Sequence, residues 1–317
     1  MIILLTLVLI VALIVSGLVL FAANTARKVE AAVPPRGKFI EIEGQRLHYV
    51  DTGGTGPAIV MIHGLGGTLW NYTYALVDKL SGEFRVIAVD RPGSGYSARA
   101  DGAPANLVAQ ASSLAKFIRA LGLKQPLLVG HSLGGALSLA IALDHPDCAG
   151  GLALIAPFTQ AQDDVPDAFK GLVVNSPVMR KIIAWTLAIP MSIRNAPELL
   201  KVVFGPDAAP ADFPTRGAGL LSLRPKSFYN TSFDLAAANE DMPGLMKRYG
   251  VLTIPLGMLF AKGDRILDYR RQGEAMKQQC PALDLVLVDE HGHMLPVTAP
   301  DATASLIRGV AARHLVR

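Results

Sequence analysis

The chain has 317 residues, of which 51% are hydrophobic and 6% aromatic, and its formal net charge at pH 7 is +4. Its basic residues are scattered in short pairs such as Arg180-Lys181 and Arg270-Arg271. Nucleic-acid-binding proteins typically carry dense basic runs, so the charge pattern argues against a nucleic-acid partner. The apolar fraction is ample for a large core.

Residues 2–23 are almost wholly apolar and carry no charge. As a helix, this stretch would span about 30 Å, the thickness of the hydrocarbon core of a bilayer. A signal peptide has a basic n-region and a shorter apolar run, whereas no basic residue precedes this one. We therefore predict an N-terminal transmembrane anchor over residues 1–25 and a linker over residues 26–37. Cleavage of the segment as a signal peptide, giving a secreted protein, is the alternative.

Several basic residues follow the apolar run, whereas only the terminal amine precedes it: Arg27, Lys28, Arg36 and Lys38. The positive-inside rule then favours a cytoplasmic position for the rest of the chain, although long translocated domains can override that bias.

Residues 38–52 alternate in polarity around Gly44, as an edge hairpin does. Later apolar runs, mostly separated by helical patterns, predict strands at residues 58–63, 85–90, 126–130, 151–155, 251–260 and 283–288. Strands that alternate with helices are typical of a mostly parallel α/β sheet.

Residues 158–250 contain no clear strand but several helix-like segments, at 177–188, 197–204 and 227–238. They predict an all-helical insertion that divides a core into residues 38–157 and 251–317. The apolar run 181–191 fits either a small core of this insertion or a lipid-facing surface.

The sequence Gly130-His131-Ser132-Leu133-Gly134 follows an apolar run and opens a helix of small residues. A serine held on a tight turn from strand to helix is typical of a nucleophile whose hydroxyl stands clear of the sheet. Glycines at 130 and 134 fit this turn, because side chains there would collide with the adjoining strand and helix.

A serine nucleophile needs a base, and that base needs an orienting acid. Asp264 follows the apolar run 251–260, and His293 follows the run 283–288. Because catalytic groups of parallel α/β sheets collect at the carboxyl ends of strands, Ser132, Asp264 and His293 are expected to meet there. The backbone amides of Leu65, after the run 58–63, and of Leu133 are the expected donors to an oxyanion.

Together with His63-Gly64 and the run Asp90-Arg91-Pro92-Gly93-Ser94-Gly95-Tyr96-Ser97, these motifs resemble the α/β-hydrolase fold superfamily, in its lipase and esterase-like branch with a helical cap. The resemblance covers residues 38–317 and implies an eight-stranded, mostly parallel sheet flanked by helices, with residues 158–250 as the cap. Haloalkane dehalogenases and epoxide hydrolases are similar elsewhere but carry aspartate at the nucleophile position. Ser132 therefore argues against both activities.

Other polar residues compete for these roles. His291 is the alternative base, but a Gly-His pair after the last strand, here Gly292-His293, is the pattern of the family. For the acid, Asp264 is preferred to the nearby Asp268 and Asp289 because Gly263-Asp264-Arg265 matches the family's loop. The remaining candidates are expected to be structural: His63 and His131 beneath the loops, Asp90 with Arg91 as a loop-bracing ion pair, and Cys148 and Cys280 as free thiols.

The resemblance implies a membrane-anchored serine hydrolase that cleaves a lipophilic carboxylic ester through an acyl-enzyme on Ser132. No cofactor is implied, and no His, Cys, Asp or Glu cluster has the spacing of metal ligands. A carbon-carbon bond hydrolase of the meta-cleavage type and an acyltransferase share the same machinery. A catalytically inactive binding or scaffold protein is the alternative from another class. The oligomeric state is left open.

Overall fold

The computed structural model describes residues 1–162 and 164–315, in which eight strands form one sheet in the order β1-β2-β4-β3-β5-β6-β7-β8. Strand β2 pairs antiparallel with β1 and with β4, and every other neighbouring pair is parallel. The strands are β1 (Lys38–Ile42), β2 (Gln45–Asp51), β3 (Ala58–Ile62), β4 (Arg85–Val89), β5 (Leu127–His131), β6 (Gly151–Ile155), β7 (Leu256–Ala261) and β8 (Asp284–Val288). The predicted mostly parallel eight-stranded sheet is confirmed.

One predicted strand begins too early in the sequence. Residues 249–251 form a short 3-10 turn, η4 (Tyr249–Val251), and β7 begins only at Leu256. Val251 is 68% exposed, and Pro255 lacks the N–H that a ladder position requires. The apolar run at 251–254 was therefore wrongly assigned to the strand, because composition alone does not reveal where pairing starts.

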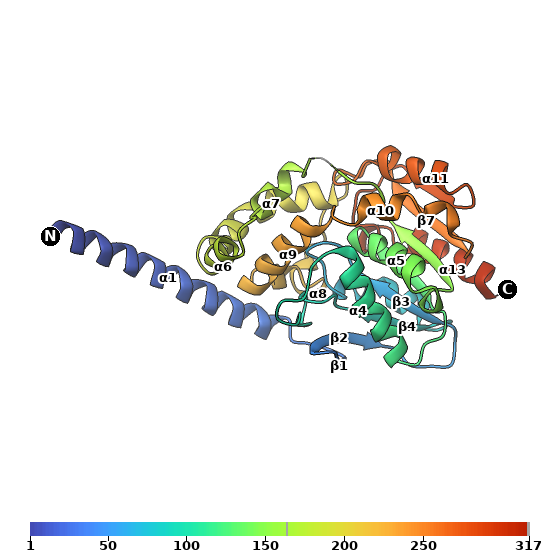
Figure 1. Ribbon diagram of the computed structural model, residues 1–317, viewed down its shortest axis with the longest axis horizontal. Helices are drawn as coiled ribbons and strands as arrows, with labels where there is room; N and C mark the ends of the chain where they lie inside the picture. The colour runs from blue at the N-terminus through green and yellow to red at the C-terminus, as the bar shows by residue number, and fades with distance from the viewer. Residues whose placement is uncertain (163, 316–317) are drawn as a thin grey trace.

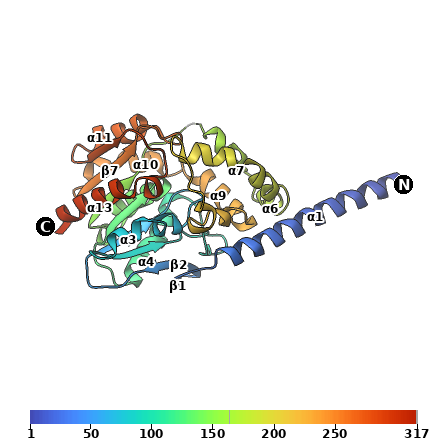
Figure 2. The same ribbon diagram turned by 180° about the vertical axis from the view of Figure 1, so that it is seen from behind.

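Helices cover both faces of the sheet (Figure 1). Helices α4 (Leu107–Ala120) and α5 (Leu133–Asp144) pack together on one face, and Figure 2, seen from behind, shows α13 (Pro300–Leu315) and α3 (Leu76–Leu80) on the other. Residues 133–142 of α5 are all buried, which fits its run of Ala, Gly and Leu. The shorter flanking elements are α2 (Trp70–Thr73), η1 (Pro146–Cys148), η5 (Arg270–Glu274), α11 (Ala275–Gln279) and α12 (Leu295–Thr298).

Between β6 and β7, the described residues form helices and turns without a strand, as predicted. They are η2 (Asp167–Leu172), α6 (Pro177–Trp185), α7 (Ala188–Phe204), α8 (Phe213–Arg216), η3 (Gly219–Ser222), α9 (Pro225–Ala237), α10 (Met242–Met246) and η4. Helix α7 begins well before the predicted start at 197 and contains Pro197 in its interior. Proline favours the first turn of a helix, and the predicted start at 197 rests on that preference, but here Pro197 is tolerated inside an amphipathic helix.

The N-terminal helix α1 (Ile2–Ala32) is longer than predicted and has the length and apolar composition to cross a membrane. The predicted linker at 26–37 is therefore helical through Ala32. Val29 and Val33 are buried against the rest of the molecule, so this segment has the packing face that its composition did not suggest. Figure 1 shows α1 projecting from the side of the molecule that carries α6.

Both cysteines, Cys148 and Cys280, are buried free thiols, as predicted. Strand β7 lies between β6 and β8, near whose starts they sit, and this separation keeps them apart. Residue 163 of the predicted insertion and residues 316–317 of the second core segment lie outside the described residues.

Candidate active site

Ser132 occupies a strained turn between β5 and α5. Its backbone has φ 54° and ψ −121°, a left-handed conformation that side chains other than glycine rarely adopt. The turn is fixed because the amide of Ser132 donates to the carbonyl of Ile155 at 3.0 Å and its own carbonyl accepts from Phe158 at 3.0 Å. The side chain is 8% exposed.

The two flanking glycines are required by close packing. A Cβ atom at Gly134 would overlap the carbonyl oxygen of Ile62 at the end of β3. A Cβ atom at Gly130 would overlap the carbonyl oxygen of Gly134 in α5. The predicted collisions with the adjoining strand and helix are therefore present, and they explain why the turn needs this glycine pattern.

Asp264 and His293 meet at the carboxyl ends of β7 and β8. The Nδ1 atom of His293 lies 2.7 Å from Oδ2 of Asp264, whose side chain is 1% exposed. The other carboxylate oxygen of Asp264 accepts from the amides of Ile266, at 2.8 Å, and Leu267, at 3.0 Å. These backbone donors fix the carboxylate, and the carboxylate in turn fixes the tautomer and the plane of the imidazole.

His131 connects this pair to the serine turn. Its ring lies beside the ring of His293, with centroids 4.8 Å apart, and its Nε2–H donates to the carbonyl of His293 at 2.9 Å. Burial, reinforced by the neighbouring His293, lowers the pKa of His131 to about 3, so its ring is neutral. Because His131 directly precedes Ser132, this contact brings the loop of His293 against the turn that carries the serine.

The competing residues are held by other partners. The Nδ1 atom of His291 lies 3.1 Å from Oδ1 of Asp207, between α7 and α8. Asp289 pairs with Lys262 at 2.7 Å. Asp268 accepts from the amides of two residues that follow it. These contacts hold the alternative acids Asp268 and Asp289 to partners other than His293, whereas Asp264 contacts His293 directly.

Asp207 was missed by the sequence analysis. Besides its contact with His291, it accepts from the amide of Gly292 at 3.0 Å, so it fixes the loop immediately before His293. A Cβ atom at Gly292 would also overlap the carbonyl oxygen of Gly205. Position 292 therefore requires glycine because the backbone of the insertion packs against it. No local sequence pattern indicates this close contact.

The loop after β3 lies directly against the nucleophile turn. A Cβ atom at Gly64 would lie 2.8 Å from the Cβ atom of Ser132. Within residues 1–162 and 164–315, the amides of Leu65 and Leu133 donate to no protein acceptor. Two free amides beside a serine side chain have the chemistry of an oxyanion site.

His63 shapes that loop from beneath. Its Nδ1–H donates to the carbonyl of Gly64 at 2.9 Å, and its Nε2 accepts from the amide of Arg91 at 3.0 Å. Burial, followed by the charge of Arg91, lowers the pKa of His63 to about 3, so it is neutral. Both ring nitrogens are occupied, which fits the structural role predicted for this residue.

Asp90 and Arg91 do not pair with each other, and the predicted ion pair between them is wrong. Asp90 lies 2.7 Å from Nδ1 of His48 and accepts from the amides of Leu69 and Tyr96. The side chains of consecutive residues at the end of a strand point to opposite faces of the sheet, so Asp90 and Arg91 contact different partners.

Arg91 joins the loop after β3 to the insertion. Fully buried, it donates to the carbonyls of His63 and Gly64 and to the carboxylate of Asp234 on α9, the last at 2.8 Å. Arg99 also pairs with Asp234. The sequence gives no local signal for this link, because Arg91 and Asp234 are far apart in the chain.

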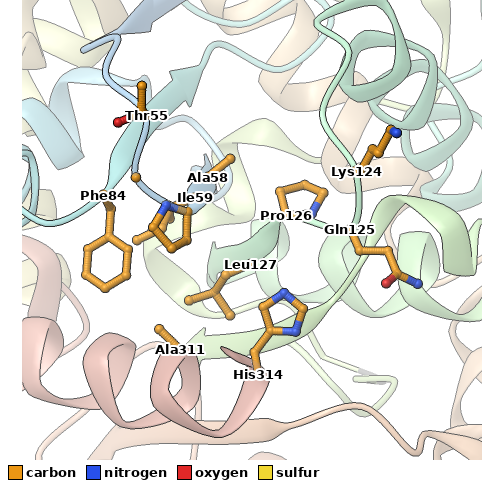
Figure 3. Close-up of a pocket in the computed structure, with 12 residues that line it drawn as sticks. Thr55, Ala58, Ile59, Phe84, Lys124, Gln125, Pro126, Leu127, Ala311 and His314 are labelled. Atoms are coloured by element: carbon orange, nitrogen blue, oxygen red, sulfur yellow. The ribbon is translucent and has the colours of Figure 1, made fainter. Parts of the chain in front are cut away.

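A cavity of about 350 Å³ lies at the opposite edge of the sheet, at the amino ends of β3 and β5 (Figure 3). It is lined by Ile59, Phe84, Leu127, Ala311 and His314, among others. Beside the loop after β3, a much smaller space of about 10 Å³ separates Gly66–Thr68 from Leu221–Ser222 and Thr231. The insertion therefore lies close over this loop. In the described part of the chain, no group of three His, Cys, Asp or Glu side chains is placed to hold a metal ion.

Comparisons with known proteins agree with this architecture. The chain is 35% identical over 121 residues to the dihydrolipoyllysine-residue acetyltransferase component of the acetoin cleaving system of Cupriavidus necator, which covers 38% of this chain and 32% of that protein. It is 30% identical over 152 residues to haloalkane dehalogenase 2 of Mycobacterium tuberculosis, covering 47% of this chain and 52% of the relative. The chain thus spans about a third to a half of the length of these curated relatives.

Among solved structures, the crystal structure of a membrane phospholipase A, described as a bacterial virulence factor, matches with a TM-score of 0.70 and 21% identity. The match covers 99% of this chain and 99% of that one, and at this identity it shows a shared fold. The family model for the alpha/beta hydrolase family matches residues 59–306, which is more than half of the chain. The chain therefore belongs to the alpha/beta hydrolase family.

Proposed function

We propose that this protein is a membrane-anchored serine hydrolase that cleaves carboxylic esters with lipophilic acyl groups. The observation that carries the proposal is the 2.7 Å contact between Asp264 and His293, in a loop that His131 holds against the Ser132 turn. A serine at a strained strand-to-helix turn, a buried acid and an imidazole that contacts this acid are the parts that an acyl transfer to serine needs.

In the proposed mechanism, Nε2 of His293 takes the proton from the hydroxyl of Ser132 as its oxygen attacks the ester carbonyl. Asp264 accepts from Nδ1–H and stabilises the imidazolium that forms. The amides of Leu65 and Leu133 stabilise the oxyanion. His293 then gives its proton to the leaving alcohol, and the acyl group remains on Ser132. A water molecule, activated by the same imidazole, finally hydrolyses the acyl-enzyme.

Two observations support a lipophilic ester delivered from a bilayer. Helix α1 carries an uncharged apolar run at residues 2–23, and the membrane phospholipase A matches nearly the whole chain in fold. The basic residues that follow the run support a cytoplasmic position for the hydrolase domain. Residues 38–157 and 251–317 are proposed as the core, and residues 158–250 as the cap.

The test is to replace Ser132 by alanine. We expect Ser132→Ala to lower the turnover of an aryl ester by roughly four orders of magnitude, because only the oxyanion and binding contributions remain. Labelling by a fluorophosphonate probe should disappear as well. Circular dichroism is the control, since the loss of one oxygen should leave the fold intact. Turnover near that of the wild type would refute Ser132 as the nucleophile.

A further inference from the structure

The cap exposes a continuous set of large apolar side chains on one side of α6 and at the start of α7. Val178, Ile182 and Trp185 are spaced by four and three residues, so they share one face of α6. Leu187 and Met191, at the start of α7, are also four residues apart and share one face of that helix. With Met179 they form what we term the cap face, and each member is between 41% and 68% exposed.

The opposite side of the same helices supplies the internal packing of the cap. Ala184, Ala188 and Ile189 are buried, and Arg180 reaches Ser232 of α9 at 3.0 Å. Part of the apolar run 181–191 therefore forms the small core that the sequence allowed. Its other large apolar side chains face outward and are exposed.

Helix α1 lies next to α6, as the two ribbon views and direct contacts between the helices agree. Contacts join α1 to α6, α7, α9 and η3. Leu18 and Val19 are partly buried and Ala22 is fully buried, whereas residues 2–17 are exposed. The cap thus begins to cover α1 within the apolar run, before that run ends at residue 23.

This contact between the cap and residues 18–22 indicates how deep the cap would lie relative to the bilayer. If residues 2–23 span the hydrocarbon layer, residues 18–23 lie inside its edge and extend over about 9 Å of helix. An element packed against them lies at the boundary of headgroups and acyl chains, where amphipathic helices insert by about 5–10 Å. The charges agree, since the exposed charged residues of the segment 177–197 are Lys181 and Arg194, both basic.

We propose that the cap face inserts into the same leaflet from which α1 enters the bilayer, and that anionic phospholipid headgroups surround it. This inference rests on the membrane anchor of the proposed function. It deepens that function, because a cap seated in the leaflet would receive its substrate as a membrane-resident lipid ester rather than from the aqueous phase.

Trp185 is a natural probe of this proposal. The sequence contains two tryptophans, and Trp70 is buried in the core, whereas Trp185 is 41% exposed on the cap face. The full-length protein would be reconstituted into phosphatidylcholine and phosphatidylglycerol vesicles with or without bromine on the acyl chains. We expect brominated lipid to quench most of the Trp185 emission, taken as the difference between wild type and Trp185→Phe. Quenching by aqueous iodide instead of by brominated lipid would overturn the proposal.

Flotation of the same vesicles separates the two levels of inference. Protein that fails to float with the lipid would refute the anchor, and with it the docking of the cap. Protein that floats while iodide quenches Trp185 would refute the docking alone. A fluorophosphonate labelling measurement on the same sample reports the proposed serine chemistry independently of both.

A charge placed in the cap face tests the functional consequence. Val178 and Val251 are equally exposed, at 68% each, but Val251 lies in η4, which packs near α11. We expect Val178→Asp to lower hydrolysis of a vesicle-borne lipid ester by about fivefold, because the charge opposes insertion, and to leave hydrolysis of a soluble short-chain ester unchanged. Val251→Asp should leave both rates unchanged. Equal rates for wild type and Val178→Asp on vesicles would contradict the proposal.

Discussion

At the scale of single residues, the site combines a strained serine with a fixed imidazole. The positive φ of Ser132 costs energy, and glycines at 130 and 134 allow the close approach of strand and helix that this turn requires. Both carboxylate oxygens of Asp264 accept hydrogen bonds, one from His293 and the other from two backbone amides. Rotation of the imidazole would break the first contact, so the ring is held in one orientation.

The choice between the two nearby histidines is testable. We expect His293→Ala to reduce aryl ester turnover by roughly four orders of magnitude, similar to Ser132→Ala, because the serine loses its base. His291→Ala should reduce turnover by less than about tenfold, since it removes one contact to Asp207. The kcat values of the two purified variants decide the question. The reverse ranking would move the base by two residues.

The buried neutral histidines predict a pH dependence of stability. The pKa values of His63 and His131 are lowered from 6.5 to about 3, so the folded protein binds fewer protons than the unfolded chain between these values. The stabilisation is therefore fully present above pH 6.5 and is lost progressively as the pH falls toward 3.

We expect the thermal midpoint to fall clearly between pH 7.5 and pH 5. In His131→Gln, which keeps a polar side chain without a titrating ring, the fall should be smaller than in wild type. An equally steep fall in this variant would show that His131 does not contribute.

At the scale of elements, the end of α1 belongs structurally to the hydrolase domain. Val29 and Val33 are buried, and Glu30 lies 3.2 Å from Arg224, which donates to the carbonyl of Gly95 in the loop after β4. Tyr96 in that loop donates to the carbonyl of Val33. Removal of the apolar run alone and removal of the whole helix should therefore have different consequences.

Two truncations test this division. We expect deletion of residues 1–25 to release a soluble and active hydrolase, because it removes the apolar run but keeps Val29, Glu30 and Val33. Deletion of residues 1–33 should lower stability by about 2–4 kcal/mol, since two buried valines are lost. Thermal unfolding of the two proteins measures the difference. Equal midpoints would mean that the end of α1 contributes nothing.

The helical insertion between β6 and β7 is joined to the rest of the molecule at several separate points. Asp234 of α9 forms ion pairs with Arg91 and Arg99. Asp207 contacts the ring of His291 and accepts from the amide of Gly292. Thr231 of α9 lies over Gly66 in the loop after β3. A displacement of α9 would therefore move charged partners of the loops on which the proposed chemistry depends.

At the scale of the whole molecule, α1 projects away from the sheet on the side that carries α6 (Figures 1 and 2), which suits the proposed lipophilic substrate. An apolar acyl pocket gains about 0.8 kcal/mol for each methylene that it buries. We therefore expect kcat/KM to rise from acetate to octanoate esters of the same alcohol, measured below their critical micelle concentrations. A higher kcat/KM for the acetate ester would indicate a small acyl pocket and contradict the lipophilic substrate.

The sequence determined the features that depend on local pattern. Periodicity gave the alternation of strands and helices, and the glycine spacing around Ser132 gave the strained turn. The order of Asp264 and His293 after their strands placed them at one edge of the sheet, because parallel strands end together. The length and composition of residues 2–23 predicted an apolar helix. They did not predict where this helix ends, because its last turns are stabilised by packing against the rest of the molecule.

Only the tertiary structure decided which residues distant in sequence touch. Arg91 finds Asp234 rather than its neighbour Asp90, and Asp207 reaches the loop before His293, because the insertion folds back over the core. The same folding buries one side of α6 and leaves Trp185 on the other. Such contacts are set by how layers pack, and a linear pattern carries no record of the partner that a side chain will meet.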